Sequence, residues 1–459
     1  MNINLEKINK IFFVGIGGIG ISAVARILKS QGKEVIGSDA SQSEITDELT
    51  RDGIKVFIPQ KAENVPQDAD LAVYTVAAPP DNIERKKIKE LKIQEFSYPE
   101  FLGQLLSDKY GIGVSGTDGK TTTTAMIGKI FLDAGLDPTI VIGSKTGYLG
   151  GNSRAGSGKH FIFESDEYKR AFDHYRPKIA VITNIAPDHL DYYSDLEDIK
   201  SAFGEYLTRV PDDGFIIANF DDENTKEVVG GKKAKIISFA IESGAEVMAK
   251  NIRLQEGGQN FDLYYQNKKL GEIKLPLPAK YNIYNSLGAI AVALVCGIDF
   301  GIIKKSLADF RGAWRRFEKI GEIEERPIIV DYAHTPYAVR KTIEAAKEFY
   351  PNKKILSVFQ PHQYSRTKNL FNEFVGSFDA ADQVIVSDIF YVKGRERPED
   401  FNISSKKLVE AAKKNSARAQ YGGDLKSTGE LIKKQAADFD LILIMGAGDI
   451  YEMAKKLVK

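Results

Sequence analysis

A glycine-rich segment that also carries a lysine and several threonines, Gly116–Thr124, has the residue types needed to bind a polyphosphate. It follows the apolar run Tyr110–Ser115 and opens a helical pattern, which gives the order strand, loop, helix. Glycines let backbone N–H groups approach phosphates, and the start of the helix adds partial positive charge. In such loops the lysine reaches the β- and γ-phosphates and the next hydroxyl binds magnesium. The candidate nucleotide-binding residues are Gly116, Thr117, Asp118, Gly119, Lys120, Thr121 and Thr122.

This loop departs from the strict nucleotide-binding spacing, which would place a further glycine where Val114 stands. A helix cap followed by a surface lysine is therefore the structural alternative. The strand-like run before the loop and the helical pattern after it favour the nucleotide-binding interpretation.

A second glycine-rich turn, Gly15–Gly20, lies between the strand-like run Ile11–Val14 and an amphipathic stretch. Asp39 follows another strand-like run, Glu34–Gly37, where an acidic side chain could accept a hydrogen bond from a ribose hydroxyl. NAD, FAD and nucleotide sugars all fit this pattern, and a tight turn with close helix packing is the structural alternative. The glycines that would let a pyrophosphate rest on the helix N-terminus are Gly15, Gly17, Gly18 and Gly20.

Polar side chains follow two further strand-like runs. Glu164 ends the run Phe161–Phe163, and the segment Thr183–Asp191, which contains His189, directly follows an apolar strand. Open α/β sheets bind ligands at the carboxyl ends of their strands. We therefore expect Glu164 and His189 to lie near the phosphate loop. Carboxylates are common magnesium ligands and an imidazole is a less usual one, so hydrogen bonding to the backbone is the alternative for His189.

The composition is that of a globular protein with several domains, since 43% of the 459 residues are hydrophobic and 27% are charged. Lys+Arg and Asp+Glu both total 63, so no net basic charge favours nucleic acid or an anionic membrane as a partner. Cys296 is the only cysteine, which excludes disulfides and cysteine-based zinc sites. Met1–Lys10 is not followed by a signal-type segment, and no apolar run has membrane-spanning length, so we expect a cytoplasmic protein.

Short β-branched runs alternate with helical patterns along most of the chain, which indicates βαβ units around mostly parallel sheets. We predict an α/β protein with three domains, residues 1–106, 107–311 and 312–459. The segment Phe261–Leu275 has a polar turn between two strand-like runs and is expected to be a hairpin. The segment Gly143–Gly158 is rich in glycine and serine and is expected to be a mobile loop.

Taken together, these segments resemble the Mur ligase family, the ATP-dependent amide-forming enzymes of bacterial cell-wall precursor synthesis. The resemblance covers the whole chain and is greatest to the branch that adds L-alanine to UDP-N-acetylmuramate. It implies a Rossmann-like N-terminal domain, a central P-loop ATPase-like domain and a Rossmann-like C-terminal domain that binds the amino acid. The segments in family order are Gly15–Gly20, Gly116–Thr124, Glu164–Glu167, Thr183–Asp191, Arg315–Glu318, Asp331–Pro336, Phe359–Thr367 and Gly446–Asp449.

The resemblance also implies a mechanism in which ATP phosphorylates the muramate carboxylate and an amine then displaces phosphate from the acyl phosphate. Thr121 and Glu164 would bind one magnesium ion, and His189 would bind a second metal. The implied catalytic residues are Lys120, Glu164, His189 and Arg316, with Arg315 as the alternative to its neighbour. The other implied ATP contacts are Asn282 and Asn285 for the adenine and Asp331 for the ribose.

For the substrates, the resemblance implies UDP-N-acetylmuramate at the N-terminal glycine turn and L-alanine in the C-terminal domain. The residues implied for the UDP-sugar are Gly15, Gly17, Gly18, Gly20, Ser38, Asp39, Asn152 and Arg154. Those implied for the amino acid are Tyr332, His334, His362 and Arg366. A monomer or a weak homodimer is expected.

Several residues depart from the alanine-adding pattern. Asp118 stands where that branch usually has histidine, Gln363 where a second basic residue is common, and Asp331–Pro336 resembles branches that add later amino acids. These departures leave open which amino acid or peptide is added. A ligase that joins UDP-N-acetylmuramate to a murein peptide during recycling is the alternative within the family. A dinucleotide-dependent oxidoreductase, supported by Gly15–Gly20 and Asp39 alone, and a non-catalytic nucleotide-binding scaffold are the alternatives from other classes.

Overall fold

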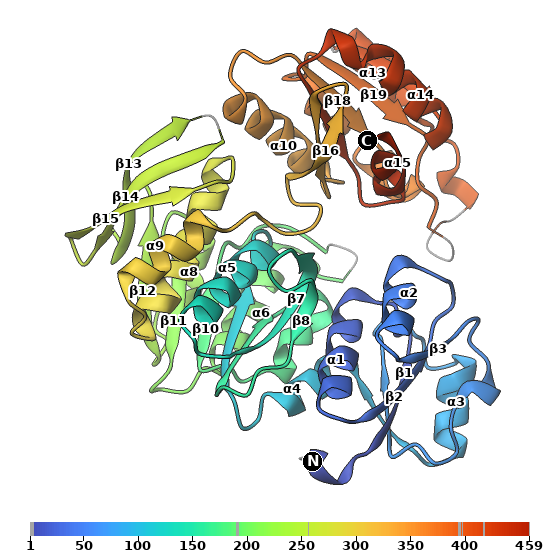
Figure 1. Ribbon diagram of the computed structural model, residues 1–459, viewed down its shortest axis with the longest axis vertical. Helices are drawn as coiled ribbons and strands as arrows, with labels where there is room; N and C mark the ends of the chain where they lie inside the picture. The colour runs from blue at the N-terminus through green and yellow to red at the C-terminus, as the bar shows by residue number, and fades with distance from the viewer. Residues whose placement is uncertain are drawn as a thin grey trace. The chain divides into compact units, whose positions relative to one another are not determined.

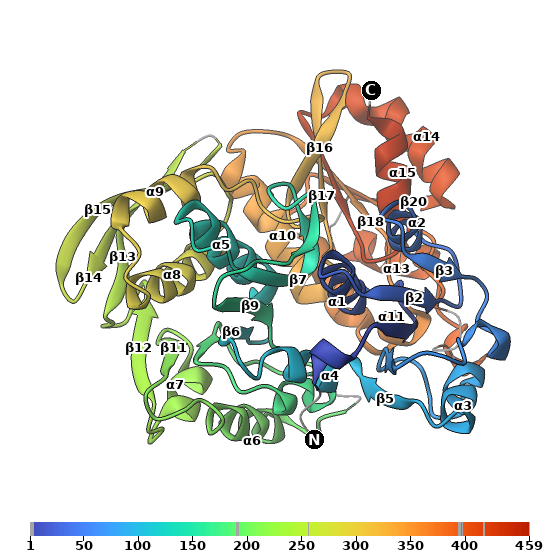
Figure 2. The same cartoon turned by 60° about the horizontal axis from the view of Figure 1, so that its bottom comes forward.

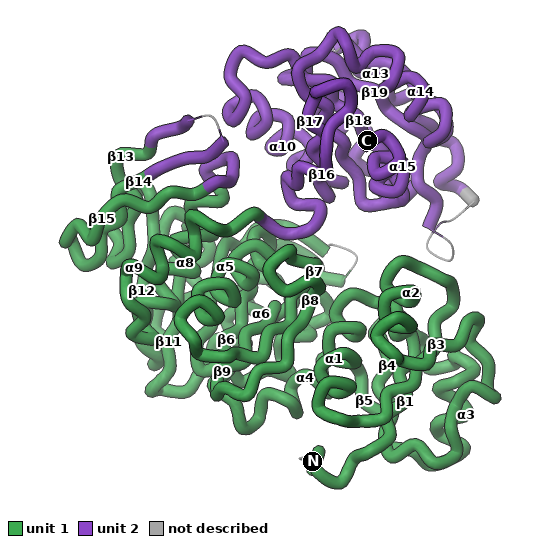
Figure 3. The backbone as a smooth tube through the Cα atoms, in the orientation of Figure 1, with its two compact units in different colours: residues 1–252, 261–275, 281–311 green, residues 253–260, 276–280, 312–459 purple. Residues whose placement is uncertain are grey.

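The computed structural model describes residues 4–189, 192–255, 257–392, 396, 398–415 and 418–458. The chain forms two compact units (Figure 3). Unit 1 comprises residues 1–252, 261–275 and 281–311, and unit 2 comprises residues 253–260, 276–280 and 312–459. The three domain boundaries drawn from the sequence stay predictions.

Unit 1 begins with a five-stranded sheet in the order β3-β2-β1-β4-β5, drawn in blue in Figure 1. All its neighbouring strands are parallel. The strands are β1 (Lys10–Val14), β2 (Glu34–Ser38), β3 (Lys55–Phe57), β4 (Leu71–Tyr74) and β5 (Gln94–Ser97). The helices are α1 (Ile19–Ser30), α2 (Glu44–Arg51), α3 (Ile83–Glu90) and α4 (Tyr98–Leu105).

The second sheet of unit 1 has ten strands in the order β15-β14-β13-β12-β11-β10-β6-β9-β7-β8. They are β6 (Tyr110–Ser115), β7 (Thr139–Thr146), β8 (Gly151–Arg154), β9 (His160–Glu164), β10 (Ile179–Ile182), β11 (Phe215–Asn219), β12 (Lys235–Ala240), β13 (Val247–Gln255), β14 (Gly258–Tyr265) and β15 (Lys268–Leu275). The helices are α5 (Lys120–Asp133), α6 (Leu196–Leu207), α7 (Glu223–Val229), α8 (Lys280–Val295) and α9 (Phe300–Ala308). Figure 2 shows α5, α8 and α9 on one face of this sheet and α6 and α7 on the other.

Unit 2 contains a six-stranded sheet in the order β16-β17-β21-β18-β19-β20, in which only β16 and β17 pair antiparallel. Its strands are β16 (Glu318–Ile323), β17 (Arg326–Asp331), β18 (Ile355–Phe359), β19 (Gln383–Ser387), β20 (Ala419–Gly423) and β21 (Leu441–Met445). Its helices are α10 (Pro336–Phe349), α11 (Tyr364–Asn369), α12 (Phe371–Val375), α13 (Ser405–Lys414), α14 (Leu425–Gln435) and α15 (Ile450–Leu457). Short 3₁₀ helices span Leu5–Lys7, Ala62–Asn64, Tyr168–His174, Gly376–Phe378, Pro398–Asp400 and Ala436–Asp438.

The central strands are mostly apolar because helices cover both faces of each parallel sheet. Every residue of β10, β18 and β21 is buried. The predicted α/β class with mostly parallel sheets is confirmed. Among the described residues, no helix combines the length and apolar character needed to cross a membrane.

Two local predictions have different outcomes. The expected hairpin at Phe261–Leu275 corresponds to the end of β14 and the whole of β15. The expected mobile loop at Gly143–Gly158 is wrong, because β7 pairs antiparallel with β8 there. The backbone hydrogen bonds of this pair order a segment whose glycine and serine content alone favours a flexible coil.

Candidate active site

The loop Gly116–Gly119 joins β6 to α5 and is built on the segment that follows β10. The amide of Asp118 donates to Asn184 Oδ1 at 2.9 Å, and Thr183 Oγ1 donates to the Asp118 carbonyl at 2.6 Å. Gly116 has φ 133° and Gly119 has φ 85°. A Cβ at these positions would lie 2.0 Å from Thr183 Oγ1 and 2.3 Å from Asn285 Oδ1. Both glycines are therefore required by backbone conformation and by close packing.

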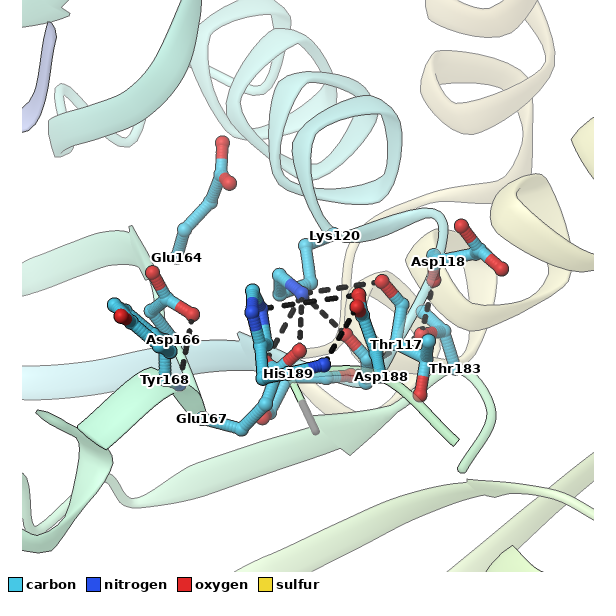
Figure 4. Close-up of polar contacts among 12 residues, drawn as sticks. Thr117, Asp118, Lys120, Glu164, Asp166, Glu167, Tyr168, Thr183, Asp188 and His189 are labelled. Atoms are coloured by element: carbon cyan, nitrogen blue, oxygen red, sulfur yellow. Dashed lines mark hydrogen bonds and ion pairs between the residues drawn. The ribbon is translucent and has the colours of Figure 1, made fainter. Parts of the chain in front are cut away.

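Lys120 begins α5, and its ammonium points back under the loop (Figure 4). Its Nζ donates to the carbonyls of Gly116 and Thr117 at 2.5 and 3.2 Å, and to Glu167 Oε1 and Oε2 at 2.9 and 3.0 Å. The Lys120 side chain is 16% exposed and that of Glu167 is 3% exposed. Burial raises the pKa of the Glu167 carboxyl, and the Lys120 ammonium opposes that rise. Burial lowers the pKa of Lys120, but the carboxylates of Glu167, Asp166 and Glu164 together outweigh that effect and leave the pKa above its usual value.

The residues predicted to bind metal fall into two groups. Thr121 Oγ1 donates to Glu164 Oε2 at 3.1 Å, and Glu164 Oε1 accepts a hydrogen bond from the Gly143 amide. His189 instead lies with two acidic neighbours, Asp166 and Glu167, whose ligand atoms are all within 4.8 Å of one another and of its own. The Glu164 carboxylate points away from the His189 ring (Figure 4). The donors thus suit two separate cations rather than one shared ion.

His189 has a strained backbone, with φ 52°. Its ring lies 4.6 Å from that of Tyr168, and its Nε2 is 3.7 Å from Asp188 Oδ2. The alternative interpretation was that the imidazole bonds only to the backbone. The described contacts of the ring are instead with side chains. Leu190 and Asp191, the end of the sequence segment that contains His189, lie outside the described residues.

Asn282 and Asn285 are buried on α8, beside the start of α5. Asn285 Nδ2 donates to Asn282 Oδ1 at 3.1 Å, and Thr123 Oγ1 donates to Asn285 Oδ1 at 3.3 Å. This contact holds α8 against the helix that follows the phosphate loop. The predicted adenine contact of both asparagines stays a prediction.

The N-terminal glycine turn is hydrogen-bonded to Ser38 and Asp39, at the end of β2. The Gly17 amide donates to Asp39 Oδ2 at 2.9 Å, and the amides of Gly15 and Ile16 donate to the Ser38 carbonyl at 2.9 Å each. The buried Ser38 hydroxyl donates to Glu84. Asp39 therefore shapes the turn before α1, and its predicted ribose contact, like the predicted ligand contacts of Gly18 and Gly20, remains untested.

Asn152 and Arg154 both lie on β8. Asn152 is fully buried, and its amide nitrogen donates to the Ile19 carbonyl and, at 3.2 Å, to Ser22 Oγ. Arg26 Nη1 donates to Asn152 Oδ1 at 2.7 Å. The Asn152 amide is therefore engaged by α1, so it links the first helix to the ten-stranded sheet. Arg154 forms an exposed ion pair with Asp137. The predicted contacts of both side chains with the UDP-sugar stay predictions.

In unit 2 the two adjacent arginines differ sharply. Arg315 is 7% exposed, and its guanidinium donates to the carbonyls of Gly446 and Gly448 while lying 4.9 Å from the Tyr332 ring centre. Burial lowers the pKa of Arg315. Arg316 is exposed and lies 5.3 Å from the same ring. The Arg316 guanidinium is thus the more accessible of the two, and its catalytic role stays a prediction.

We expect the paired substitutions to separate these roles. Arg315→Ala should lower the free energy of unfolding by about 3 kcal/mol, because two carbonyls lose a buried charged donor. Arg316→Ala should change it by less than about 0.5 kcal/mol and lower turnover instead. Urea unfolding and steady-state assays of both variants measure the difference. The reverse pattern would contradict this assignment.

Asp331 ends β17 and is oriented by neighbouring backbone. Its Oδ2 accepts from the Phe317 amide and its Oδ1 from the Ala333 amide, both at 2.8 Å. Burial raises the pKa of this carboxyl, and the positive charge of Arg316 opposes the rise. The carboxylate therefore stands at a strand end in unit 2, as the sequence pattern indicated, and its ribose contact stays a prediction.

The four residues predicted to bind the amino acid lie together in unit 2. The ring of His334 is 5.2 Å from that of Tyr332 and 6.0 Å from that of His362. Arg366 Nη1 lies 3.2 Å from His362 Nδ1. His362 stacks on Phe390 with ring centres 5.3 Å apart. Side chains from three strand ends thus form one cluster.

A cavity of about 530 Å³ lies beside this cluster, at the carboxyl ends of β18 to β21. Phe390 lines the cavity and also supports the His362 ring. The other lining residues are Gln360, Asp388, Ile389, Tyr391, Asp424, Leu425, Lys426 and Asp449. These residues are far apart in the sequence, so their spacing does not predict the cavity. The rule that ligands bind at the carboxyl ends of strands could have indicated it.

The sequence does not indicate the role of Glu167. Three carboxylates, Glu164, Asp166 and Glu167, lie at or just after the end of β9, so the sequence indicates an acidic strand end. It does not show which carboxylate points at Lys120, because the 3₁₀ helix that begins at Tyr168 turns the backbone there.

Three family models match this chain. The model described as Mur ligase family, catalytic domain, matches residues 10–110. The Mur ligase middle domain matches residues 114–293, and the Mur ligase, glutamate ligase domain matches residues 315–448. Together they cover the glycine turn, the phosphate loop and the residues of unit 2 predicted to bind the amino acid.

Similar proteins match over the full length. The chain is 41% identical to the UDP-N-acetylmuramate–L-alanine ligase of Caldanaerobacter subterraneus, with 100% of this chain and 99% of that protein covered. It is 39% identical to the ligase of the same name from Aquifex aeolicus, with 99% and 98% covered. The crystal structure of UDP-N-acetylmuramate-alanine ligase from Thermotoga maritima matches with TM-score 0.84 at 29% identity, covering 98% of each chain. A murein peptide ligase structure from Psychrobacter arcticus, at 22% identity and TM-score 0.72 over 98% of each chain, shows the same fold. By these matches along its whole length, the chain belongs to the Mur ligase family.

Proposed function

We propose that this protein joins L-alanine to UDP-N-acetylmuramate in an ATP-dependent reaction that proceeds through an acyl phosphate. The observation that carries the proposal is the phosphate loop, in which Lys120 and Thr121 lie beside the acidic end of β9 and the His189 segment. The full-length relatives named UDP-N-acetylmuramate–L-alanine ligase support the choice of both substrates.

The chemical difficulty is the approach of a γ-phosphoryl group to a carboxylate, since both are negatively charged. Lys120 and the backbone amides of the loop would hold the phosphates, and Arg316 would add a further positive charge. Magnesium fits the carboxylate and hydroxyl donors of Glu164 and Thr121, and a second cation fits the imidazole and carboxylates around His189. Bound metal would neutralise phosphate charge. The protein itself positions both reactants and forms no covalent bond to them.

The remaining substrates would bind at the other two groups of residues. The pyrophosphate of the UDP-sugar would rest on the N-terminus of α1, which directly follows the glycine turn. The carboxylate of L-alanine would pair with the Arg366 guanidinium beside His362. Substrates of this kind point to a cytoplasmic enzyme. We expect a monomer or a weak homodimer.

A phosphate-release screen tests the proposed reaction. The protein is mixed with ATP, magnesium and UDP-N-acetylmuramate, and the amine is L-alanine, meso-diaminopimelate, lysine or a murein tripeptide. We expect release to be fastest with L-alanine. Faster release with the tripeptide would identify a recycling ligase, and release that needs no UDP-sugar or amine would exclude an amide ligase.

Arg366→Lys probes the amino acid site. Lysine keeps the positive charge but lacks the planar fork that pairs with a carboxylate. We expect the KM for L-alanine to rise about 10-fold or more while the KM for ATP stays within a factor of two. Steady-state kinetics with each substrate varied in turn measure both constants. Equal increases in the two constants would contradict the assignment of Arg366 to the amino acid site.

A further inference from the structure

The ammonium group of Lys120 has its hydrogen-bonding capacity fully in use. It contacts the Gly116 and Thr117 carbonyls and both carboxylate oxygens of Glu167 (Figure 4). An ammonium group has only three N–H donors. A phosphate oxygen can therefore bind Lys120 only if one of these partners is given up.

Glu167 is the charged partner among them, and it is held firmly in place. Its side chain is 3% exposed, so little water screens the ion pair. Its backbone carbonyl accepts a hydrogen bond of 2.5 Å from the buried Tyr193 hydroxyl. Breaking the pair costs more here than at the surface, because the carboxylate stays buried after the lysine leaves.

We infer that Glu167 is a reversible counter-ion that competes with the nucleotide for Lys120; this rests on the proposed function, because it takes the ligand to be ATP. In the free enzyme Glu167 keeps the lysine in the loop. When ATP binds, Lys120 turns from Glu167 to the β- and γ-phosphates. Breaking the buried pair thus makes the free energy of ATP binding less favourable. The same contact weakens ADP binding, which favours product release. Glu167 is a positioning residue in this account.

The test is nucleotide binding to Glu167→Gln, which removes the charge and keeps the shape. It is done without magnesium, so that no cation at the group of Asp166, Glu167 and His189 contributes to the affinity. We expect isothermal titration calorimetry to show ATP bound about 10-fold more tightly than by the wild type, because the pair that ATP must break is gone. AMP lacks the β- and γ-phosphates, so its affinity should be the same for both proteins. In a Lys120→Met background, Glu167→Gln should no longer change ATP affinity.

Glu205→Gln is the matched control, since Glu205 forms an exposed ion pair on α6 and should leave ATP affinity unchanged. Unchanged or weaker ATP binding by Glu167→Gln would overturn the inference, as would tightening that persists without Lys120. If the glutamine variant does not fold, Glu167→Asp, whose shorter side chain weakens the ion pair, should bind ATP more tightly than the wild type does, and wild-type affinity there would overturn the inference. A wild-type protein that binds no ATP would overturn the proposed function as well.

Discussion

We expect Lys120→Ala to lower ligase turnover about 100-fold or more while the protein remains folded. The lysine lies at the first position of α5 and contacts loop carbonyls and Glu167 rather than the apolar core. Its loss removes the positive charge predicted for the β- and γ-phosphates. Without the ammonium, Glu167 can take up a proton, because burial raises its pKa. Circular dichroism and phosphate release measure fold and turnover separately.

Lys129→Ala is the control for this substitution. Lys129 lies on the same helix and forms an i,i+4 ion pair with Asp133. We expect this variant to keep wild-type turnover. Turnover near the wild-type value in a folded Lys120→Ala protein would contradict the assignment of Lys120 to the phosphate site.

Glu164→Gln should lower turnover about 100-fold at ordinary magnesium concentration and raise the magnesium concentration needed for half-maximal rate. Glutamine has the same shape: its oxygen can accept from the Gly143 amide and its NH2 group can donate to Thr121 Oγ1, so packing around β9 is retained. What it lacks is the negative charge that a divalent cation requires. Magnesium titrations of initial rate, with Glu205→Gln as control, measure the effect. An unchanged magnesium dependence would exclude Glu164 as a ligand.

The fold was largely predictable from local patterns. Apolar runs such as Tyr110–Ser115 and the glycine-rich turns after them specify parallel strands followed by helices, because each signal is local and repeats along the chain. Residues close to one another at a strand end, such as Lys120 and Thr121, could be placed for the same reason. The cluster around His362 was predicted through the resemblance to a family, since its members come from separate strands.

Other features depend on side-chain directions that sequence spacing does not determine. Asn152 was assigned to a flexible loop, yet backbone pairing forms β8 and turns its amide toward α1. Arg315 and Arg316 are equivalent in sequence, and only the fold shows that the first is buried. Glu167 is one of several neighbouring carboxylates, and its contact with Lys120 follows from the turn of the backbone after β9.

The aromatic surroundings of Arg315 have a practical consequence. Trp314, the only tryptophan of the chain, lies 5.2 Å from the Tyr451 ring, and its own ring is 5.6 Å from the Arg315 guanidinium. Arg315 also contacts Tyr332, which follows directly on the proposed ribose-binding carboxylate Asp331. Indole fluorescence of the unmodified protein therefore arises from one place, beside the Arg315 guanidinium in unit 2. The fluorescence of Trp314 can thus report on this part of unit 2 without an added label.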